Sequence, residues 1–266
     1  MSGQPFAFVP VATGRSQQKP RATGRTMVID DGLPLGVQRD LLEAGGRFVD
    51  IAKIKTGSAR LYAEDVLTAK IALYRGHGIA VFPGGQFLEY VLHVMGEEAA
   101  EAFFAEAIRL GFTAVEVSDN VVALPGDLRT RLTTQAVDAG LTVFGEIGSK
   151  ETDSEPQTLI AQGRQSLDAG AELLLIEAAE LFQDGALRRG LFNALCNSFE
   201  PEQLMFELPG PWIDGVCHHQ IEALSKLLVR ELGPDVNIGN LAPGRIIDFE
   251  GTRTGLGVAG PPKGAS

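Results

Sequence analysis

Four segments in the middle of the chain repeat one pattern and decide the fold. They read AVEVSDN at residues 114–120, TVFGEIG at 142–148, LLLIEAA at 173–179 and LMFELPG at 204–210. Each is a nearly continuous apolar run that leads into small or polar residues, which is typical of a strand buried on both faces. Each also contains a glutamate, and these four glutamates lie 30, 31 and 30 residues apart.

Four similar runs extend the pattern in both directions. They read TMVIDDG at 26–32, FVDIAKIK at 48–55, IAVFPGG at 79–85 and VNIGNLAP at 236–243. Amphipathic stretches between the runs, at 96–111, 157–171 and 215–233, predict helices that end at Gly111, Gly170 and Gly233. Residues 58–76 and 185–199 have a weaker helical pattern.

Eight strands that alternate with helices over about 230 residues predict the α/β class and a (β/α)8 TIM barrel. The alternative is a doubly wound sheet, in which the first strand usually leads into a glycine-rich dinucleotide loop. Residues 26–32 lead instead into DDGLPLG, which favours the barrel. We predict one domain over residues 25–256, with a flexible or loosely docked N-terminal arm at 1–24 and a C-terminal tail at 257–266, because both ends are rich in Gly and Pro and lack periodicity.

Composition restricts the class of protein. The chain has 266 residues, with 34 acidic and 23 basic side chains and a formal net charge of −11. This acidic balance argues against binding to nucleic acid or to an anionic membrane surface. No apolar run approaches the roughly 18 residues of a membrane span, and two cysteines exclude a disulfide scaffold. We expect a cytoplasmic protein that acts on a small anionic substrate, and the sequence allows a homo-oligomer without specifying one.

The four regularly spaced glutamates are the first candidates for a site. Active sites of (β/α)8 barrels lie at the carboxyl ends of the strands. An acid inside an apolar strand is costly to bury unless it is paired, hydrogen-bonded or bound to a metal. A structural salt bridge would explain one such residue, whereas a ring around one pocket explains the whole set, which comprises Glu116, Glu146, Glu177 and Glu207.

Lysines and further oxygen ligands follow the same strands. Lys53 and Lys55 have the alternate spacing that places both on one side of a strand, and Lys150 follows the fifth predicted strand. Ser118 and Asp119 follow the fourth strand. Carboxylates with few histidines favour a hard cation such as Mg²⁺ over zinc. We therefore expect Mg²⁺ and lysines that together bind a small anion.

The words at the strand ends resemble the motifs of the phosphosulfolactate synthase family. They are TMVIDDG, VDIAKIKTGSA, FPGGQFLE, VEVSDN, GEIGSK, IEAAE, FELP and NIGNLAPGRIIDFEGTRTGL, and they span about Arg21 to Leu256. The resemblance implies a (β/α)8 barrel that adds sulfite to phosphoenolpyruvate with Mg²⁺, a carbon–sulfur lyase. It implies Lys150 and Lys53 as catalytic lysines, with Lys150 as the proton donor, and Asn237 and Asn240 in substrate binding. It also implies Glu116, Asp119, Glu146 and Glu177 as metal ligands. Their positions at the strand ends add Lys55 and Ser118 as substrate-binding candidates.

Several positions depart from the family words. Lys55 and Thr56 replace a Gly-Trp pair, and Gln86 replaces a threonine. Ala179 occupies the place of an arginine and Leu181 that of a serine. These changes leave two alternatives open: a related barrel enzyme with a different nucleophile or acceptor, and a non-catalytic, stress-related barrel protein.

Overall fold

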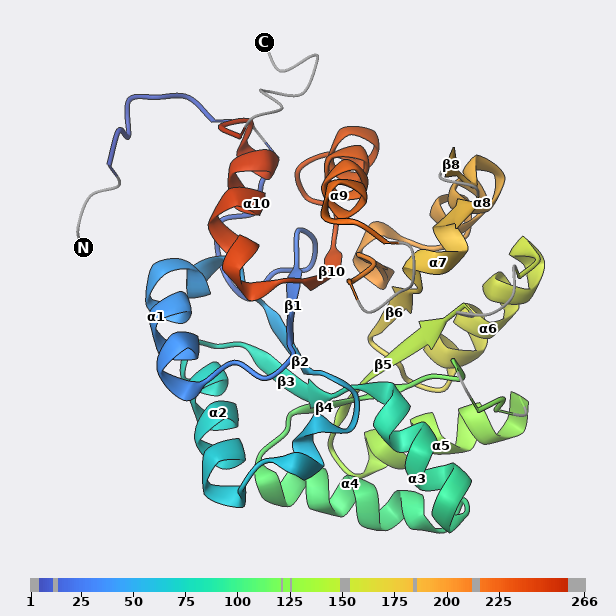
Figure 1. The fold of residues 1–266 in the computed structure, drawn as a ribbon. Coiled ribbons are helices and arrows are strands. Elements are labelled where there is room, and N and C mark those ends of the chain that lie inside the picture. The colour runs from blue at the N-terminus through green and yellow to red at the C-terminus, as the bar shows by residue number, and fades with distance from the viewer. Residues whose placement is uncertain are drawn as a thin grey trace.

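The computed structural model contains an eight-stranded parallel sheet that curves into a nearly closed barrel (Figure 1). The structure describes residues 5–11, 14–120, 122–124, 126–148, 154–183, 186–211 and 216–257. The barrel strands are β1 (Thr26–Asp30), β2 (Ile51–Ile54), β3 (Ala80–Pro83), β4 (Ala114–Val117), β5 (Thr142–Ile147), β6 (Leu173–Ile176), β9 (Leu204–Glu207) and β10 (Ile238–Leu241). All eight predicted strands are confirmed, and the fold is a (β/α)8 barrel.

Helices cover the outside of the barrel (Figure 1). The α-helices are α1 (Leu35–Gly45), α2 (Glu64–Gly76), α3 (Gly85–Met95), α4 (Ala99–Leu110), α5 (Gly126–Asp138), α6 (Pro156–Asp168), α7 (Ala178–Leu181), α8 (Arg189–Ser198), α9 (His218–Leu232) and α10 (Ile246–Thr254). Short 3₁₀ helices cover Gly46–Phe48, Thr56–Leu61, Pro201–Gln203 and Pro243–Arg245, and β7 (Phe182–Gln183) pairs with β8 (Ala186–Leu187) in a small hairpin. In the part of the chain that is described, no helix has the length and apolar character needed to cross a membrane.

The predicted helix ends are confirmed at their glycines. Gly111 caps α4 in the left-handed conformation, with φ of 96°, and Gly170 and Gly233 also have positive φ values of 106° and 87°. Residues with a Cβ rarely adopt this backbone conformation, so glycine is the residue that ends these helices at lowest cost. The sequence did not predict α3, which makes a second helix between β3 and β4.

The sheet is continuous from β3 through β2, β1, β10, β9, β6 and β5 to β4. Between the first and last strands of this order, the Thr113 backbone N–H donates to the Val81 carbonyl at 3.0 Å. The Val81 N–H in turn donates to the Thr113 hydroxyl at 2.9 Å. These contacts close the barrel and bring the ends of all eight strands around one axis.

Strand alternation divides the barrel interior into two layers. The lower layer is apolar, with fully or almost fully buried side chains: Met27, Ile51, Phe82, Ala114, Phe144, Leu173, Leu175 and Met205. Two residues further along a strand, the side chain points to the same side. Five residues of the lower layer are each followed, two positions later, by a polar residue of the upper layer. These polar residues are Lys53, Glu116, Glu146, Glu177 and Glu207. A larger apolar cluster fills the space between the sheet and the helices.

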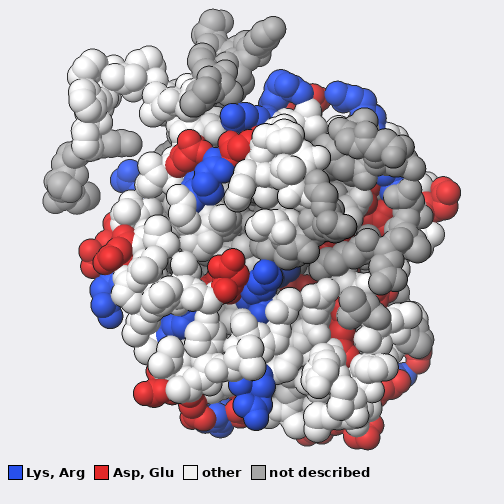
Figure 2. All heavy atoms as spheres, viewed as in Figure 1, with Lys and Arg blue, Asp and Glu red and all other residues white. Residues whose placement is uncertain are grey.

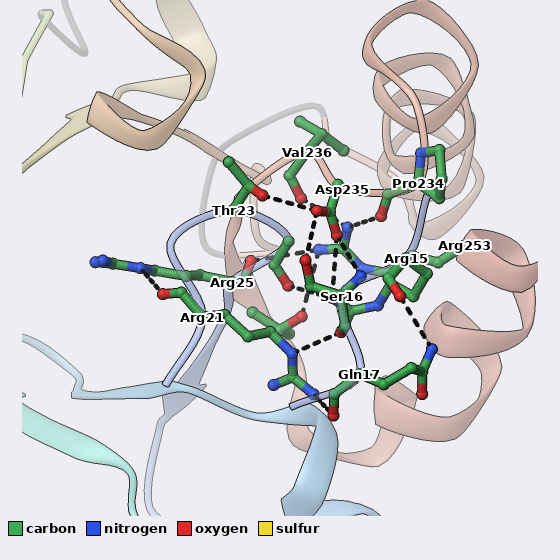
Figure 3. Close-up of polar contacts among 12 residues, drawn as sticks. Arg15, Ser16, Gln17, Arg21, Thr23, Arg25, Pro234, Asp235, Val236 and Arg253 are labelled. Carbon is green, nitrogen blue, oxygen red and sulfur yellow. Dashed lines mark hydrogen bonds and ion pairs between the residues drawn. The ribbon is translucent and has the colours of Figure 1, made fainter. Parts of the chain in front are cut away.

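Part of the predicted N-terminal arm is docked against the barrel. Figure 3 shows residues from this segment converging with the loop before β10 and with Arg253 of α10. Arg15 is 6% exposed and pairs with Glu250 at 3.0 Å, while Ser16 and Thr23 both donate to the Asp235 carboxylate at 2.7 Å. Of the two predicted states, flexible or loosely docked, residues 14–24 adopt a docked one, held by long-range hydrogen bonds that composition does not reveal. The predicted tail 257–266 lies outside the described residues, apart from Gly257.

The docked segment gives a first prediction. Replacing Arg15 by Met leaves the Glu250 carboxylate buried without this partner, and we expect a loss of about 3–5 kcal/mol in the free energy of unfolding. The matched control is Arg189→Met, because Arg189 is exposed and meets Glu231 only at 3.6 Å; this change should cost less than about 1 kcal/mol. Urea unfolding of both variants measures the difference. Equal losses would show that the Arg15–Glu250 pair contributes no more than a surface contact.

Candidate active site

A cavity of about 420 Å³ opens at the carboxyl ends of the strands. Pockets of this size are typical of small-molecule sites. Its wall combines acidic side chains with lysine side chains and glycine backbone: Ile29, Lys53, Lys55, Thr56, Gly84, Gly85, Gln86, Glu116, Glu146, Glu207 and Asn240. Figure 2 shows basic and acidic side chains next to each other near the centre of this face. The cavity therefore has the position and the chemistry expected from the sequence.

Lys53 lies at the base of the cavity between two carboxylates. Its ammonium group is 2.9 Å from Glu116 Oε2 and 2.8 Å from Glu207 Oε1. Burial opposes the charged form, but Glu116, Glu207 and Glu146 outweigh it and raise the Lys53 pKa well above the ordinary value. Lys53 is thus held as a cation. An ammonium has three N–H donors, so two carboxylates leave donor capacity for a further anion.

Three glutamates form an acidic cluster at the cavity, of which Glu146 and Glu207 line the wall. Glu146, Glu177 and Glu207 are buried, and each offers a carboxylate oxygen within 4.8 Å of those of the others. For Glu207, burial raises the pKa, Lys53 lowers it, and Glu146 and Glu177 raise it further, with a resulting value of about 7. Such a concentration of carboxylate oxygen is suited to a hard divalent cation.

The four predicted metal ligands do not all lie in one cluster in the structure. Glu146 and Glu177 belong to the cluster just described, together with Glu207, which the sequence singled out as an acid but not as a ligand. Glu116 instead pairs with Lys53, and Asp119 pairs with Arg129 at 2.6 Å. Asp119 therefore neutralises a buried guanidinium, which a strand-end position alone does not reveal.

The loop after β4 is held by a buried acid from α3. Glu89, which is 1% exposed, accepts hydrogen bonds from the Ser118 hydroxyl at 2.5 Å and from the backbone N–H of Asn120 at 3.1 Å and Val122 at 3.0 Å. The Asn120 amide in turn donates to the Glu146 carboxylate. Ser118, predicted as a substrate-binding residue, thus donates a hydrogen bond from its hydroxyl to Glu89. Through Asn120 the loop connects Glu89 to the acidic cluster.

The opposite wall of the cavity favours anions. Gly84 and Gly85 begin α3, whose first turn has no side-chain cap, so its backbone N–H groups and helix dipole are suited to negative charge. A Cβ at Gly85 would lie 2.5 Å from Glu116 Oε1, and one at Gly84 would lie 2.7 Å from the Thr56 nitrogen. Glycine is therefore required at both positions. Lys55 lines this same wall.

The two predicted asparagines lie at opposite ends of β10. Asn240 adopts a left-handed conformation with φ of 54°, lines the cavity and donates to Glu207 Oε2 at 2.7 Å. Asn237 instead donates to the carbonyls of Pro201 at 3.0 Å and Leu204 at 2.8 Å, and it accepts from the Arg25 N–H. Asn237 therefore ties loops together at the amino ends of the strands, because it precedes β10, and among the described residues it is not part of the cavity wall.

Sequence reasoning missed three contributors to this site: Glu89, Gln86 and the first turn of α3. Gln86 lines the cavity beside Lys55 and Thr56. The signal was present in residues 82–91, where two glycines follow a strand and apolar residues then recur at helical spacing. Lys150, the predicted proton donor, lies outside the described residues.

The sequence profile of the (2R)-phospho-3-sulfolactate synthase family matches residues 14–258 of this chain. The chain belongs to this family. Phosphosulfolactate synthase from Methanothermobacter thermautotrophicus is 32% identical over 249 residues, which cover 90% of this chain and 91% of the relative. The same enzyme from Methanocaldococcus jannaschii is 30% identical over 244 residues, covering 88% and 92%.

A solved structure supports the fold. The 3-hexulose-6-phosphate synthase of Salmonella typhimurium superposes with a TM-score of 0.53 at 17% identity, covering 86% of this phosphosulfolactate synthase family member and 94% of the other chain. At this identity the likeness concerns the barrel alone.

The raised pKa of Glu207 gives a second prediction. Between pH 4.5 and pH 7 the folded chain keeps a proton on Glu207 that the unfolded chain releases. The Glu207 contribution to stability is therefore complete below pH 4.5 and is lost as the pH rises through 7, by about 3 kcal/mol. Urea unfolding in a metal chelator should show that Glu207→Gln removes this part of the pH dependence. Glu43→Gln, a change at an exposed acid of α1, is the control and should leave this part of the pH dependence in place.

The contacts of Glu89 give a third prediction. Glu89→Gln weakens the hold on two backbone N–H groups, and we expect faster amide hydrogen exchange at Asn120 and Val122 with a loss of about 1–3 kcal/mol in stability. Glu101→Gln, on the exposed side of α4, is the control. Unchanged exchange at both amides would mean that Glu89 does not hold this loop.

Proposed function

We propose that this protein adds sulfite to phosphoenolpyruvate in a Mg²⁺-dependent reaction and forms (2R)-phospho-3-sulfolactate. Membership of the phosphosulfolactate synthase family supports the reaction class. The observation that carries the proposal is the division of one cavity into an acidic cluster and an anion-binding wall. A substrate with both a carboxylate and a phosphate matches a cavity that offers a cation site on one side and lysines with helix N–H groups on the other.

The residues present fit a magnesium ion. Mg²⁺ takes oxygen ligands and keeps sites for water and substrate, and Glu146, Glu177 and Glu207 offer converging carboxylate oxygens. Among the described residues, Asn240 Oδ1 is also buried without a hydrogen-bond partner in the same cavity. The chemistry that bound Mg²⁺ supplies here is electrophilic stabilisation of negative charge on the substrate carboxylate.

The reaction is an addition in which no bond to phosphorus breaks. The sulfur of sulfite forms a bond to the methylene carbon of phosphoenolpyruvate, and the electron pair of the double bond moves toward the carboxylate. A proton is then added to the carbon that carries the phosphate ester. Lys53, fixed as a cation, stabilises the growing negative charge without releasing its own proton. The proton donor remains Lys150, as the resemblance implies.

The other wall binds the remaining anionic groups in this proposal. Lys55, Gln86 and the N–H groups at the start of α3 lie where a phosphate would be attracted. Ala179 and Leu181 do not supply the contacts that the family words place there, because Leu181 is fully buried and Ala179 has no polar side chain. Lys55, Arg188 and Arg189 are the basic residues that could compensate for the missing arginine. We infer that Lys55 does so, because it lines the cavity whereas Arg188 pairs with Glu180 and Arg189 with Glu231.

The same departures favour a second candidate function. A related lyase with a different nucleophile or acceptor would keep Lys53 and the acidic cluster but change the anion-binding wall. Three of the five positions that depart from the family words line the cavity: Lys55, Thr56 and Gln86. The acidic cluster would then determine the reaction type, and the anion-binding wall would determine which substrate is bound.

The test is ³¹P NMR of purified protein with phosphoenolpyruvate, sulfite and Mg²⁺. We expect a new phosphate ester signal that requires both substrates and disappears when the metal is chelated. Glu146→Gln should lower the rate by about 100-fold or more, whereas Glu172→Gln, at an exposed acid, should leave it unchanged. Absence of a new phosphorus species at high enzyme concentration contradicts the proposal that sulfite and phosphoenolpyruvate are the substrates. Other nucleophiles would then be screened. Unchanged activity in Lys150→Ala contradicts its role as proton donor.

A further inference from the structure

An apolar groove lies outside the barrel, between α2, α3 and α4. Its volume is about 560 Å³, larger than that of the catalytic cavity, and the two share no lining residue. Its wall includes aromatic and aliphatic side chains such as Tyr62, Leu67, Phe87, Val91, Met95 and Phe103. Met95, which lines the groove, is 62% exposed. A continuous apolar surface of this kind marks an interaction site.

The same chain carries an apolar segment that packs against little else. Residues 5–11 read PFAFVPV and contain no charge. Phe6 is 75% exposed and Phe8 84% exposed, and their rings meet each other with centroids 6.3 Å apart. Phe6 also has a φ of 53°, a left-handed conformation that is unfavourable for a bulky side chain. The segment is therefore both exposed and strained in the isolated chain.

The segment and the groove lie on different sides of the molecule. The N-terminal segment leaves the barrel beside α10, whereas α3 and α4 lie across the barrel from α10 (Figure 1). Ser16, which follows the segment, is anchored to Asp235 in the loop before β10. This anchor directs the segment away from the groove of its own chain.

We propose that residues 5–11 of one copy bind in the α2–α4 groove of a second copy. In an extended conformation seven residues span about 23 Å, enough to follow the wall that α4 forms from Ala99 to Leu110, which is about 17 Å long. Phe6 and Phe8 are two residues apart, so extension places both rings on one side, facing the groove, and removes the strain at Phe6. The segment and groove belong to every copy, so the contact links identical chains into a reciprocal pair or a ring.

The charges at the groove are compatible with an uncharged occupant. Glu64 and Glu106 line the groove and are both paired with Arg109, at 2.8 Å and 2.6 Å. Binding of an uncharged segment therefore leaves these pairs intact.

The first part of the test measures association of the full chain. We expect sedimentation equilibrium at micromolar concentration to show an oligomer, and we expect the double variant Phe6→Ser/Phe8→Ser and the single variant Met95→Glu each to weaken association by at least tenfold. The control is Ile247→Glu, because Ile247 is 55% exposed on α10, outside the groove. A monomeric unmodified chain, or an oligomer that both variants leave unchanged, overturns the proposal.

The second part of the test locates the contact by disulfide formation. In a background with Cys196→Ser and Cys217→Ser, we mix Phe8→Cys chains with Met95→Cys chains under mild oxidation and expect a disulfide-linked pair of the two. Ile247→Cys replaces Met95→Cys in the control mixture and should give little of this product. No selective pair overturns the proposal. A monomeric disulfide in a chain that carries both Phe8→Cys and Met95→Cys places the segment in its own groove, which also overturns it.

Discussion

The structure depends on a buried lysine between carboxylates. The Lys53 ammonium contacts Glu116 and Glu207 at hydrogen-bonding distance, and Glu146 also raises its pKa. Removing a charge from water costs several kcal/mol unless a partner compensates, so Lys53 and its acids are stable only together. The carboxylates of Glu146, Glu177 and Glu207 remain close to one another even so, which is the physical reason for proposing a divalent cation beside them.

The barrel interior separates an apolar layer of side chains from the polar layer that contains Lys53 and the glutamates. Phe82, Phe144 and Met205 fill the lower part of the barrel with apolar side chains. Directly above them the strands end, and the polar layer begins there, still buried but at the base of the cavity. The same alternation that buries Phe144 therefore directs Glu146 into the site. Supporting residues such as Glu89 and Arg129 then hold the loop that follows β4.

The two ends of the barrel have different tasks. At the amino ends of the strands, Arg15, Arg253 and Asn237 connect the N-terminal segment, the loop before β10 and α10. Arg253 is fully buried, and burial lowers its pKa to about 9, while the carbonyls of Pro234 and Val236 each accept a hydrogen bond from it at 2.6 Å. These contacts stabilise the fold, whereas the carboxyl ends of the strands carry the proposed site, the usual division in such barrels.

The sequence by itself determined the eight strands, the barrel and the acids of the site. It could do so because buried parallel strands require apolar runs and because Glu116, Glu146, Glu177 and Glu207 recur once per strand–helix unit. Only the tertiary structure decided the partner of each acid. Glu207 contacts Lys53 and belongs to the acidic cluster, and Asp119 pairs with Arg129. These pairs connect residues from different helices and strands, so sequence spacing does not reveal them. The position of Asn237 was likewise decided by the point at which β10 begins.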